Sequence, residues 1–316
     1  MKKCFLIIIV FSFLLINLIG CNVDPSFSSS TDNTDSSNSQ NKSIEELKYQ
    51  YDSETETVTI LSFGNTVDYD QTDAYEKIQE ITHPTNIVIS EGITSIPDYF
   101  FSYSIEGASG KERNHFNQIK NVKIPNTVIK IGDSAFSYCY GLEAVSIPDS
   151  VNEIGESAFE ECKNLTKVKI GKGILKLSSN LFMNCEKLNS VIMTEGLTEI
   201  GKKAFVCCKN LSEIHLPKTV DTISESAFSG CSAIESITLP ERLKTLESYS
   251  FFECPKLKTI TIPQSTEIIG EYAIGYVSDL KNDEFFDSPI SDFTIHGKRG
   301  TVAEKYASEN GFHFVY

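Results

Sequence analysis

The stretch IGDSAFSYCYGLEAVSIPDSV, Ile131–Val151, is followed 23 residues further along the chain by IGESAFEECKNLTKVKIGKGI, Ile154–Ile174. The two copies share a glycine, a phenylalanine, a cysteine and the apolar residues around them. In steps of 23 residues from Pro125 to Pro263, the same pattern recurs without an insertion. Self-similarity at a fixed period of this length is typical of repeat proteins.

Each copy follows the consensus I-P-x-x-V-x-x-I-G-x-x-A-F-x-x-C-x-x-L-x-x-V, with leucine replacing isoleucine at some positions. The end of each copy, as in Leu165–Ile170, alternates apolar and polar residues and predicts a short strand, which a proline then ends. Apolar residues three apart in GDSAFSYC, residues 132–139, predict short helical or irregular coil. Because one copy cannot bury its apolar side alone, we expect stacked copies to form a solenoid with a parallel sheet on one face and the coil on the other.

Over about residues 85–285 this repeat resembles the BspA-like, or treponemal-type, leucine-rich repeat of bacterial surface proteins. The resemblance implies a leucine-rich-repeat solenoid and adhesion to host or neighbouring-cell proteins. The chain departs from the commoner leucine-rich pattern because its cysteine precedes the leucine, as Cys139 precedes Leu142. Ligand binding by other leucine-rich horseshoes therefore carries over only loosely.

Both ends of a repeat array need caps that prevent edge pairing with other chains. Residues 44–84 are the predicted N-terminal cap, with a β-hairpin in LKYQYDSETETVTIL, residues 47–61. Residues 286–316 are the predicted C-terminal cap: a strand near Ile295, a helix over about 301–310 with Gly311 as its C-cap, and a strand ending at Tyr316. Both segments resemble those that flank this repeat in the family.

An insertion of twelve residues, SIEGASGKERNH at about 104–115, interrupts one repeat. Insertions in repeat proteins fall in loops on one face and are often binding sites. A tolerated surface loop is the alternative.

The first 20 residues have the composition of a lipoprotein-type signal peptide. Two lysines precede the apolar stretch Phe5–Ile19, which is shorter than the roughly 20 residues of a membrane span. The sequence Leu18-Ile19-Gly20-Cys21 resembles a lipobox, which implies a lipid on Cys21; an ordinary signal peptide is the alternative. Residues 21–43, rich in Ser, Asp, Asn and Thr, are then a disordered tether. The expected location is the bacterial cell surface, on the outer membrane or the outer face of the cytoplasmic membrane.

The formal net charge of −15 argues against nucleic acid or anionic lipid as the main partner, because both attract basic proteins. The lipid anchor at Cys21 is the expected membrane contact. Proteins are the expected partners, and the chain is expected to be a monomer.

No pattern in the sequence predicts an enzyme, a cofactor or a metal site. The cysteines one repeat apart, Cys139 to Cys254, are too far apart in the chain for zinc-ligand spacing, and we expect buried free thiols, with disulfides as the alternative. Cys208 and His215 share a repeat but are expected on opposite sides of the sheet. Glu160 and Glu161 are expected to be solvated on the coil.

The exposed side of the sheet is the remaining candidate for a binding site. Its outward strand positions are expected to vary while the buried positions hold, and they carry no aromatic side chain of the kind that anchors protein interfaces. The candidate residues are Lys123, Ser146, Lys167, Lys169, Ser190, Glu213, His215, Thr238 and Thr261. The sequence thus predicts a non-enzymatic cell-surface lipoprotein that binds host or neighbouring-cell proteins in adhesion. The alternatives are a structural envelope scaffold, a polysaccharide-binding lipoprotein, and a sheet face that is merely solvated.

Overall fold

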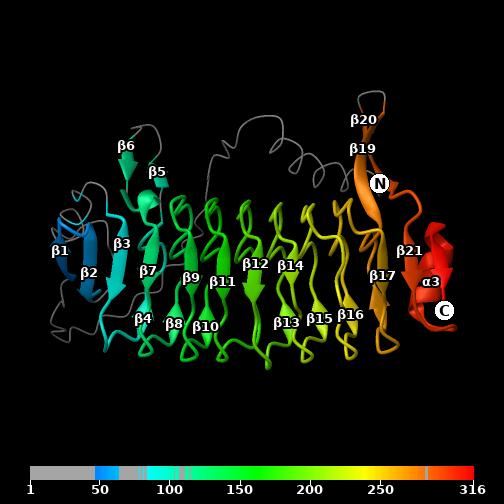
Figure 1. Ribbon diagram of the computed structural model, residues 1–316, viewed down its shortest axis with the longest axis horizontal. Coiled ribbons are helices and arrows are strands. Elements are labelled where there is room, and N and C mark those ends of the chain that lie inside the picture. The colour runs from blue at the N-terminus through cyan, green and yellow to red at the C-terminus, as the bar shows by residue number, and fades with distance from the viewer. Residues whose placement is uncertain are drawn as a thin grey trace, which may run out of the picture. The chain divides into compact units, whose positions relative to one another are not determined.

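The computed structural model describes residues 47–63, 78, 81, 84–102, 104–106, 111–113, 115–281 and 284–316 (Figure 1). The predicted signal peptide, Cys21 and the tether lie outside the described residues. The chain divides into two units, of which residues 44–278 with 287–316 form the repeat body and residues 1–43 with 279–286 the other. The repeat body contains all the residues that recur every 23 positions between Pro125 and Pro263.

One row of strands in the repeat body forms an eight-stranded sheet. Its strands, in spatial order, are β1 (Lys48–Asp52), β2 (Thr57–Ser62), β3 (Asn86–Ile89), β7 (Asn121–Lys123), β9 (Ala144–Ser146), β11 (Lys167–Lys169), β12 (Ser190–Ile192) and β14 (Glu213–Ile214). The first two strands pair antiparallel, which confirms the predicted hairpin, and all later pairs are parallel. The predicted solenoid sheet is therefore confirmed.

The sheet does not continue through the next repeat, where a strand at Ser236 to Thr238 was predicted. No strand forms over residues 234–240, so this prediction is wrong, and a second sheet of β17 (Thr259–Thr261), β21 (Thr294–His296) and β22 (His313–Val315) follows. The proline that follows each strand does not account for the gap, because β7 and β9 pair although Pro125 and Pro148 follow them.

A second row of two-residue parallel strands runs along the repeats, as the short arrows at the bottom of Figure 1 show. One group is β4 (Ser95–Ile96), β8 (Lys130–Ile131) and β10 (Glu153–Ile154); the other is β13 (Glu199–Ile200), β15 (Thr222–Ile223), β16 (Thr245–Leu246) and β18 (Ile268–Ile269). Gly155 follows β10 because a Cβ there would meet the backbone of Asp133 in the preceding repeat. The sequence analysis identified the buried residues of this row but not its strands.

Turns rather than α-helix connect the two rows, so the predicted coil is irregular. Each repeat contains two residues with left-handed backbone, such as Ser157 (φ 55°) and Glu161 (φ 59°). In the insertion, β5 (Ser104–Glu106) and β6 (Lys111–Arg113) form an antiparallel hairpin, followed by the 3-10 helix η2 (His115–Gln118).

A column of stacked phenylalanines fills the interior of the repeat body. From Phe101 through Phe251, neighbouring ring centroids lie 5.0 to 5.6 Å apart, and the rings are nearly parallel. The six ladder cysteines are buried beside them, as predicted. Each thiol donates a hydrogen bond to a phenylalanine carbonyl of the preceding repeat, as Cys185 Sγ does to Phe159 O at 3.2 Å. The cysteine ladder therefore links the repeats.

The C-terminal end has the predicted strand, helix and strand. β21 contains Ile295, and α3 (Val302–Asn310) ends at Gly311, whose φ of 71° gives the left-handed C-cap. β22 follows and pairs in parallel with β21. A hairpin of β19 (Tyr276–Lys281) and β20 (Glu284–Pro289), which the sequence analysis did not predict, precedes them.

Candidate binding surface

The predicted site residues occupy one side of the strands in the long sheet. Lys123 lies on β7, Ser146 on β9, Lys167 and Lys169 on β11, and each is exposed, whereas Val145 and Val168 between them are buried. Ser190 on β12 is half-buried. The alternation follows from the two-residue period of a strand, which places successive side chains on opposite faces.

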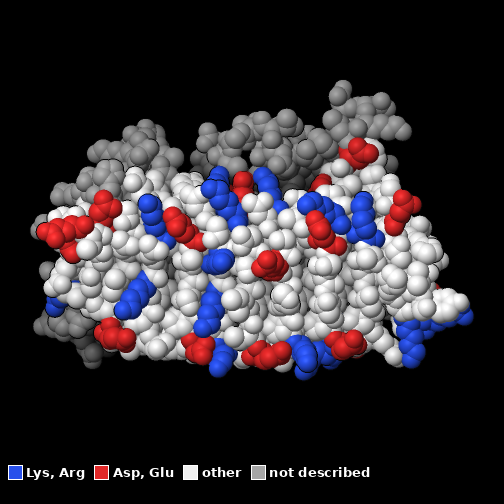
Figure 2. Space-filling model, viewed as in Figure 1, with Lys and Arg blue, Asp and Glu red and all other residues white. Residues whose placement is uncertain are grey.

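The register of the parallel strands places several of these residues side by side. Lys169 pairs with Ser146 on one side and with Ile192 on the other, and Lys167 pairs with Ala144 and Ser190. Lys123, Ser146 and Lys169 line an open groove of about 770 Å³, together with Asn126, Pro148 and Ser150. Figure 2 shows blue basic groups on this face of the repeats, with red acidic groups and white uncharged surface between them.

The remaining candidates lie further along the repeats and outside this groove. Glu213 lies on β14 and His215 just beyond its end, and both are exposed. Thr238 is exposed in the segment without a strand, and Thr261 is exposed on β17. The structure thus gathers Lys123, Ser146 and Lys169 into one groove but does not bring the whole predicted stripe into it.

One contributor to this surface was not among the predicted site residues. Ile192 is 58% exposed at the end of β12, beside Lys169. Its outward position could be predicted from the strand alternation, but an apolar residue in one repeat gives no sequence signal of a binding role, because single exposed apolar residues are common.

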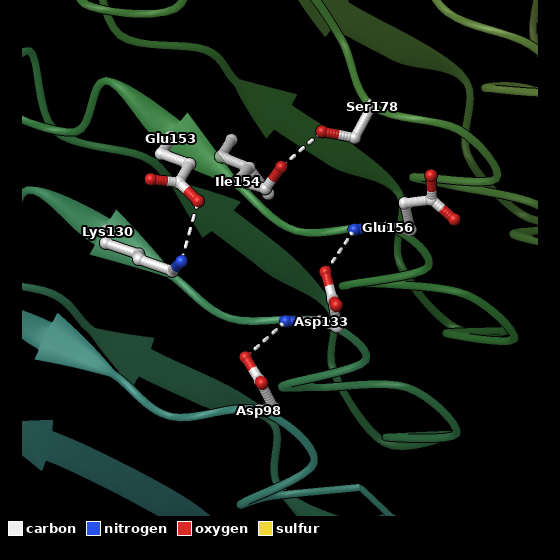
Figure 3. A network of polar contacts seen from close by, with 7 residues as sticks. All are labelled: Asp98, Lys130, Asp133, Glu153, Ile154, Glu156 and Ser178. Atoms are coloured by element: carbon white, nitrogen blue, oxygen red, sulfur yellow. Dashed lines mark hydrogen bonds and ion pairs between the residues drawn. The ribbon is translucent and has the colours of Figure 1, made fainter. Parts of the chain in front are cut away.

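The charged side chains along the second row of strands form hydrogen bonds and ion pairs within the protein (Figure 3). The backbone N–H of Asp133 donates to Asp98 Oδ1 at 2.9 Å, and that of Glu156 donates to Asp133 Oδ1 at 2.8 Å. Lys130 Nζ lies 2.6 Å from Glu153 Oε1. Ser178 Oγ also donates to the carbonyl of Ile154. A groove of about 450 Å³ follows this row, but these polar groups already join one repeat to the next.

The carboxylates at 160 and 161 were predicted to be solvated, and this prediction is wrong. Glu161 is only 6% exposed, because its left-handed backbone directs its side chain into the repeat stack. Asn184 Nδ2 donates to its Oε1 at 2.7 Å, and Lys163 Nζ lies 3.2 Å from its Oε2. Glu160 is half-buried, and burial raises the pKa of its carboxyl. Glu161 is therefore a buried link between its own repeat and that of Asn184.

The thiols have the environment of packing groups rather than nucleophiles. Cys208 is buried and donates to Phe182 O at 3.2 Å, while His215 is exposed, so the structure does not bring the two together. Burial raises the pKa of Cys139, and it raises the pKa of the half-buried Cys207 to about 11. A thiol with so high a pKa is almost entirely protonated at neutral pH and a poor nucleophile.

In the described part of the chain, no three His, Cys, Asp or Glu side chains converge as they would around a metal ion. In the same residues, no helix has the length and apolar character needed to cross a membrane.

Comparison with known proteins identifies the repeat. Residues 112–221 and 198–294, together more than half of the chain, match the family described as BspA type leucine rich repeat region, in six copies. No curated protein matches the chain.

Several solved structures are similar to it. A leucine-rich repeat protein from Eubacterium ventriosum has 24% identity and a TM-score of 0.41, covering 64% of this chain and 47% of its own. The leucine rich repeat protein of T. pallidum has 18% identity and a TM-score of 0.45, covering 85% of this chain and 95% of its own. A leucine rich cell surface protein from Faecalibacterium prausnitzii has 26% identity and a TM-score of 0.37, covering 61% of this chain and 57% of its own. The chain spans about half the length of the E. ventriosum protein. On the strength of the match over its repeats, the chain belongs to the BspA-type leucine-rich repeat family.

Proposed function

We propose that this protein is a non-enzymatic, lipid-anchored cell-surface protein whose repeat face binds other proteins in adhesion. The family supports the coarser part, a repeat scaffold for protein interaction. The observation that carries the proposal is the contrast between the two sides of each strand. Buried Val145, Val168 and Val191 are the same residue, whereas the exposed neighbours Ser146, Lys169 and Ile192 differ from one another. A constant core with a variable face is how a solenoid presents an extended binding surface.

The sequence around Cys21 supports the anchor. The apolar segment ends in Leu18-Ile19-Gly20-Cys21, and the polar tether follows at once. A flexible chain of 21 residues, Asn22 to Lys42, would hold the repeat body on the order of 25 Å from the membrane. A single lipid chain binds membranes only marginally, so the proposal requires the multiply acylated cysteine of a bacterial lipoprotein.

Protease treatment of intact cells tests location and anchor together. Wild-type cells and cells carrying Cys21→Ala are digested from outside, and the repeat body is followed by immunoblot. We expect the wild-type signal to disappear from intact cells and the variant to be released into the medium, because it lacks the acceptor for lipid.

The reverse result has an equally definite meaning. A wild-type repeat body that resists protease in intact cells but not in lysed cells faces inward, which contradicts surface display and favours an envelope scaffold. A Cys21→Ala variant that remains in the membrane fraction contradicts the lipid anchor. A periplasmic or cytoplasmic marker protein that stays undigested serves as the control for cell integrity.

A further inference from the structure

We propose that Lys123, Lys167 and Lys169, the basic cluster, together with Ile192 bind an acidic segment of a partner protein that also carries an apolar side chain. This inference rests on the proposed function, since it names the partner chemistry of the same face. It concerns strands β7 to β12 of the long sheet, and the groove lies along β7, β9 and β11.

The parallel register places the basic cluster on one short stretch of surface. Lys169 and Lys167 lie two residues apart on β11 and point to the same side. Lys123 lies two strands away, across Ser146, which corresponds to about 10 Å at the usual strand spacing. An extended acidic segment has like-facing carboxylates about 7 Å apart, so it can contact two of the three lysines at once.

The basic cluster gathers three lysines without a carboxylate partner on one sheet face. Among the described residues, no Asp or Glu forms an ion pair with Lys123, Lys167 or Lys169. Several lysines elsewhere pair with a carboxylate of the neighbouring repeat: Lys130 with Glu153 (2.6 Å), Lys176 with Glu199 (2.8 Å), Lys202 with Glu225 (2.9 Å) and Lys209 with Glu186 (3.3 Å). In a chain of net charge −15, three neighbouring cations without partners leave a local positive field for an incoming anion.

The side chains next to the lysines on the sheet are uncharged. Ala144 and Ser146 lie between β7 and β11, and Ser190 lies beside Lys167 on β12. The carboxylate of Glu213 follows one strand further along, in register with Ser190. Asp149 also lines the groove, but it accepts a hydrogen bond from the backbone N–H of Lys172 at 3.1 Å and lies 3.7 Å from Lys172 Nζ. The negative charge of Asp149 is therefore matched by Lys172 and not by the basic cluster.

Ile192 favours a polypeptide over an anionic polysaccharide. It is 58% exposed, and its register partner is Lys169, so one apolar contact lies directly beside the positive charge. A peptide can supply a carboxylate and an apolar side chain at adjacent outward positions. A polysaccharide would more often need an exposed aromatic ring to stack on, and no residue of β7, β9, β11 or β12 is aromatic.

Binding of a fluorescein-labelled glutamate-rich peptide with a central leucine tests the inference. The full chain is compared with the triple variant Lys123→Gln, Lys167→Gln, Lys169→Gln and with Ile192→Ser, by fluorescence anisotropy at low and physiological ionic strength. We expect the triple variant to bind at least about tenfold more weakly, because it removes all three cations. We expect affinity to fall with added salt and Ile192→Ser to weaken binding severalfold.

The matched control changes the same net charge at paired lysines: Lys176→Gln, Lys202→Gln, Lys209→Gln. We expect this variant to bind the peptide within about twofold of wild type, because those lysines are already neutralised. Equal weakening of the two triple variants would overturn the inference, since net charge alone would then explain binding. Tighter binding of polygalacturonate than of the peptide, unaffected by Ile192→Ser, would overturn it in favour of an anionic polysaccharide. Because the assay uses purified protein, its result is independent of whether cells display the protein, which protease treatment decides.

Discussion

A single phenylalanine connects three repeats. The ring of Phe182 lies 5.6 Å from that of Phe159 and 5.6 Å from that of Phe205. Its carbonyl accepts hydrogen bonds from Cys185 N and from the thiol of Cys208 in the next repeat, both at 3.2 Å. The ring thus contributes packing, and the backbone contributes hydrogen bonds that do not depend on which side chain is present.

Phe182→Ala separates these two contributions. It removes the ring and leaves the carbonyl, so we expect it to lower the free energy of unfolding by roughly 3 to 5 kcal/mol through lost burial and a cavity in the column. Urea denaturation followed by circular dichroism measures the loss. The control Lys187→Ala changes an exposed residue of the same repeat and should cost less than about 0.5 kcal/mol. A loss below about 1 kcal/mol for Phe182→Ala would contradict the stacked column.

The cysteine ladder is an element of its own, because its members form one line of hydrogen bonds through the body. Thiol donors reach phenylalanine carbonyls at 3.1 to 3.3 Å in six successive repeats. Cysteine suits this position because its side chain is small and apolar enough for the core, and it still supplies a weak donor.

Thiol labelling distinguishes free cysteines from disulfides in the cysteine ladder. The seven cysteines of the repeats are free in the structure, and six of them are buried. In denaturant without a reductant we expect all seven to react with iodoacetamide, located by mass spectrometry of the peptides. In the native protein only the half-buried Cys207 should react, and slowly, because its pKa is about 11. Labelling of three or fewer cysteines in denaturant would show that disulfides form.

The strands, caps and buried side chains of the repeat body show which features the sequence predicts and which it does not. The repeat spacing predicts the parallel sheet and the line of buried cysteines, because each depends on a pattern repeated at one position. The caps are predicted from local signals instead, such as the strand alternation over residues 47–61 and the C-cap Gly311. The gap over residues 234–240 has no such signal, because this repeat has the same apolar pattern as its neighbours. Burial of Glu161 depends on Asn184, its hydrogen-bond donor in the following repeat. A consensus misses features of this kind, which depend on unlike residues of two repeats.

At the scale of the whole molecule, contacts run mainly between neighbouring repeats. Hydrogen bonds repeatedly join residues 23 positions apart, such as Thr166 Oγ1 to Glu143 O and Thr198 Oγ1 to Leu175 O, both at 3.0 Å. In such an array the stability is close to a sum of repeat and interface terms, so a complete repeat can be removed while every remaining interface keeps its register.

Excision of residues 154–176 is the test of this organisation, because it removes one 23-residue period and joins Glu153 to Leu177. We expect the shortened chain to keep its strand signal in circular dichroism and to unfold cooperatively at a lower urea concentration, because one interface is lost. Excision of residues 154–165 is the control, since it removes fewer residues but shifts every later phenylalanine and cysteine out of the column. We expect that variant to lose cooperative unfolding. If the shorter deletion were the better tolerated of the two, chain length rather than repeat register would decide stability, and the nearest-neighbour description would be wrong.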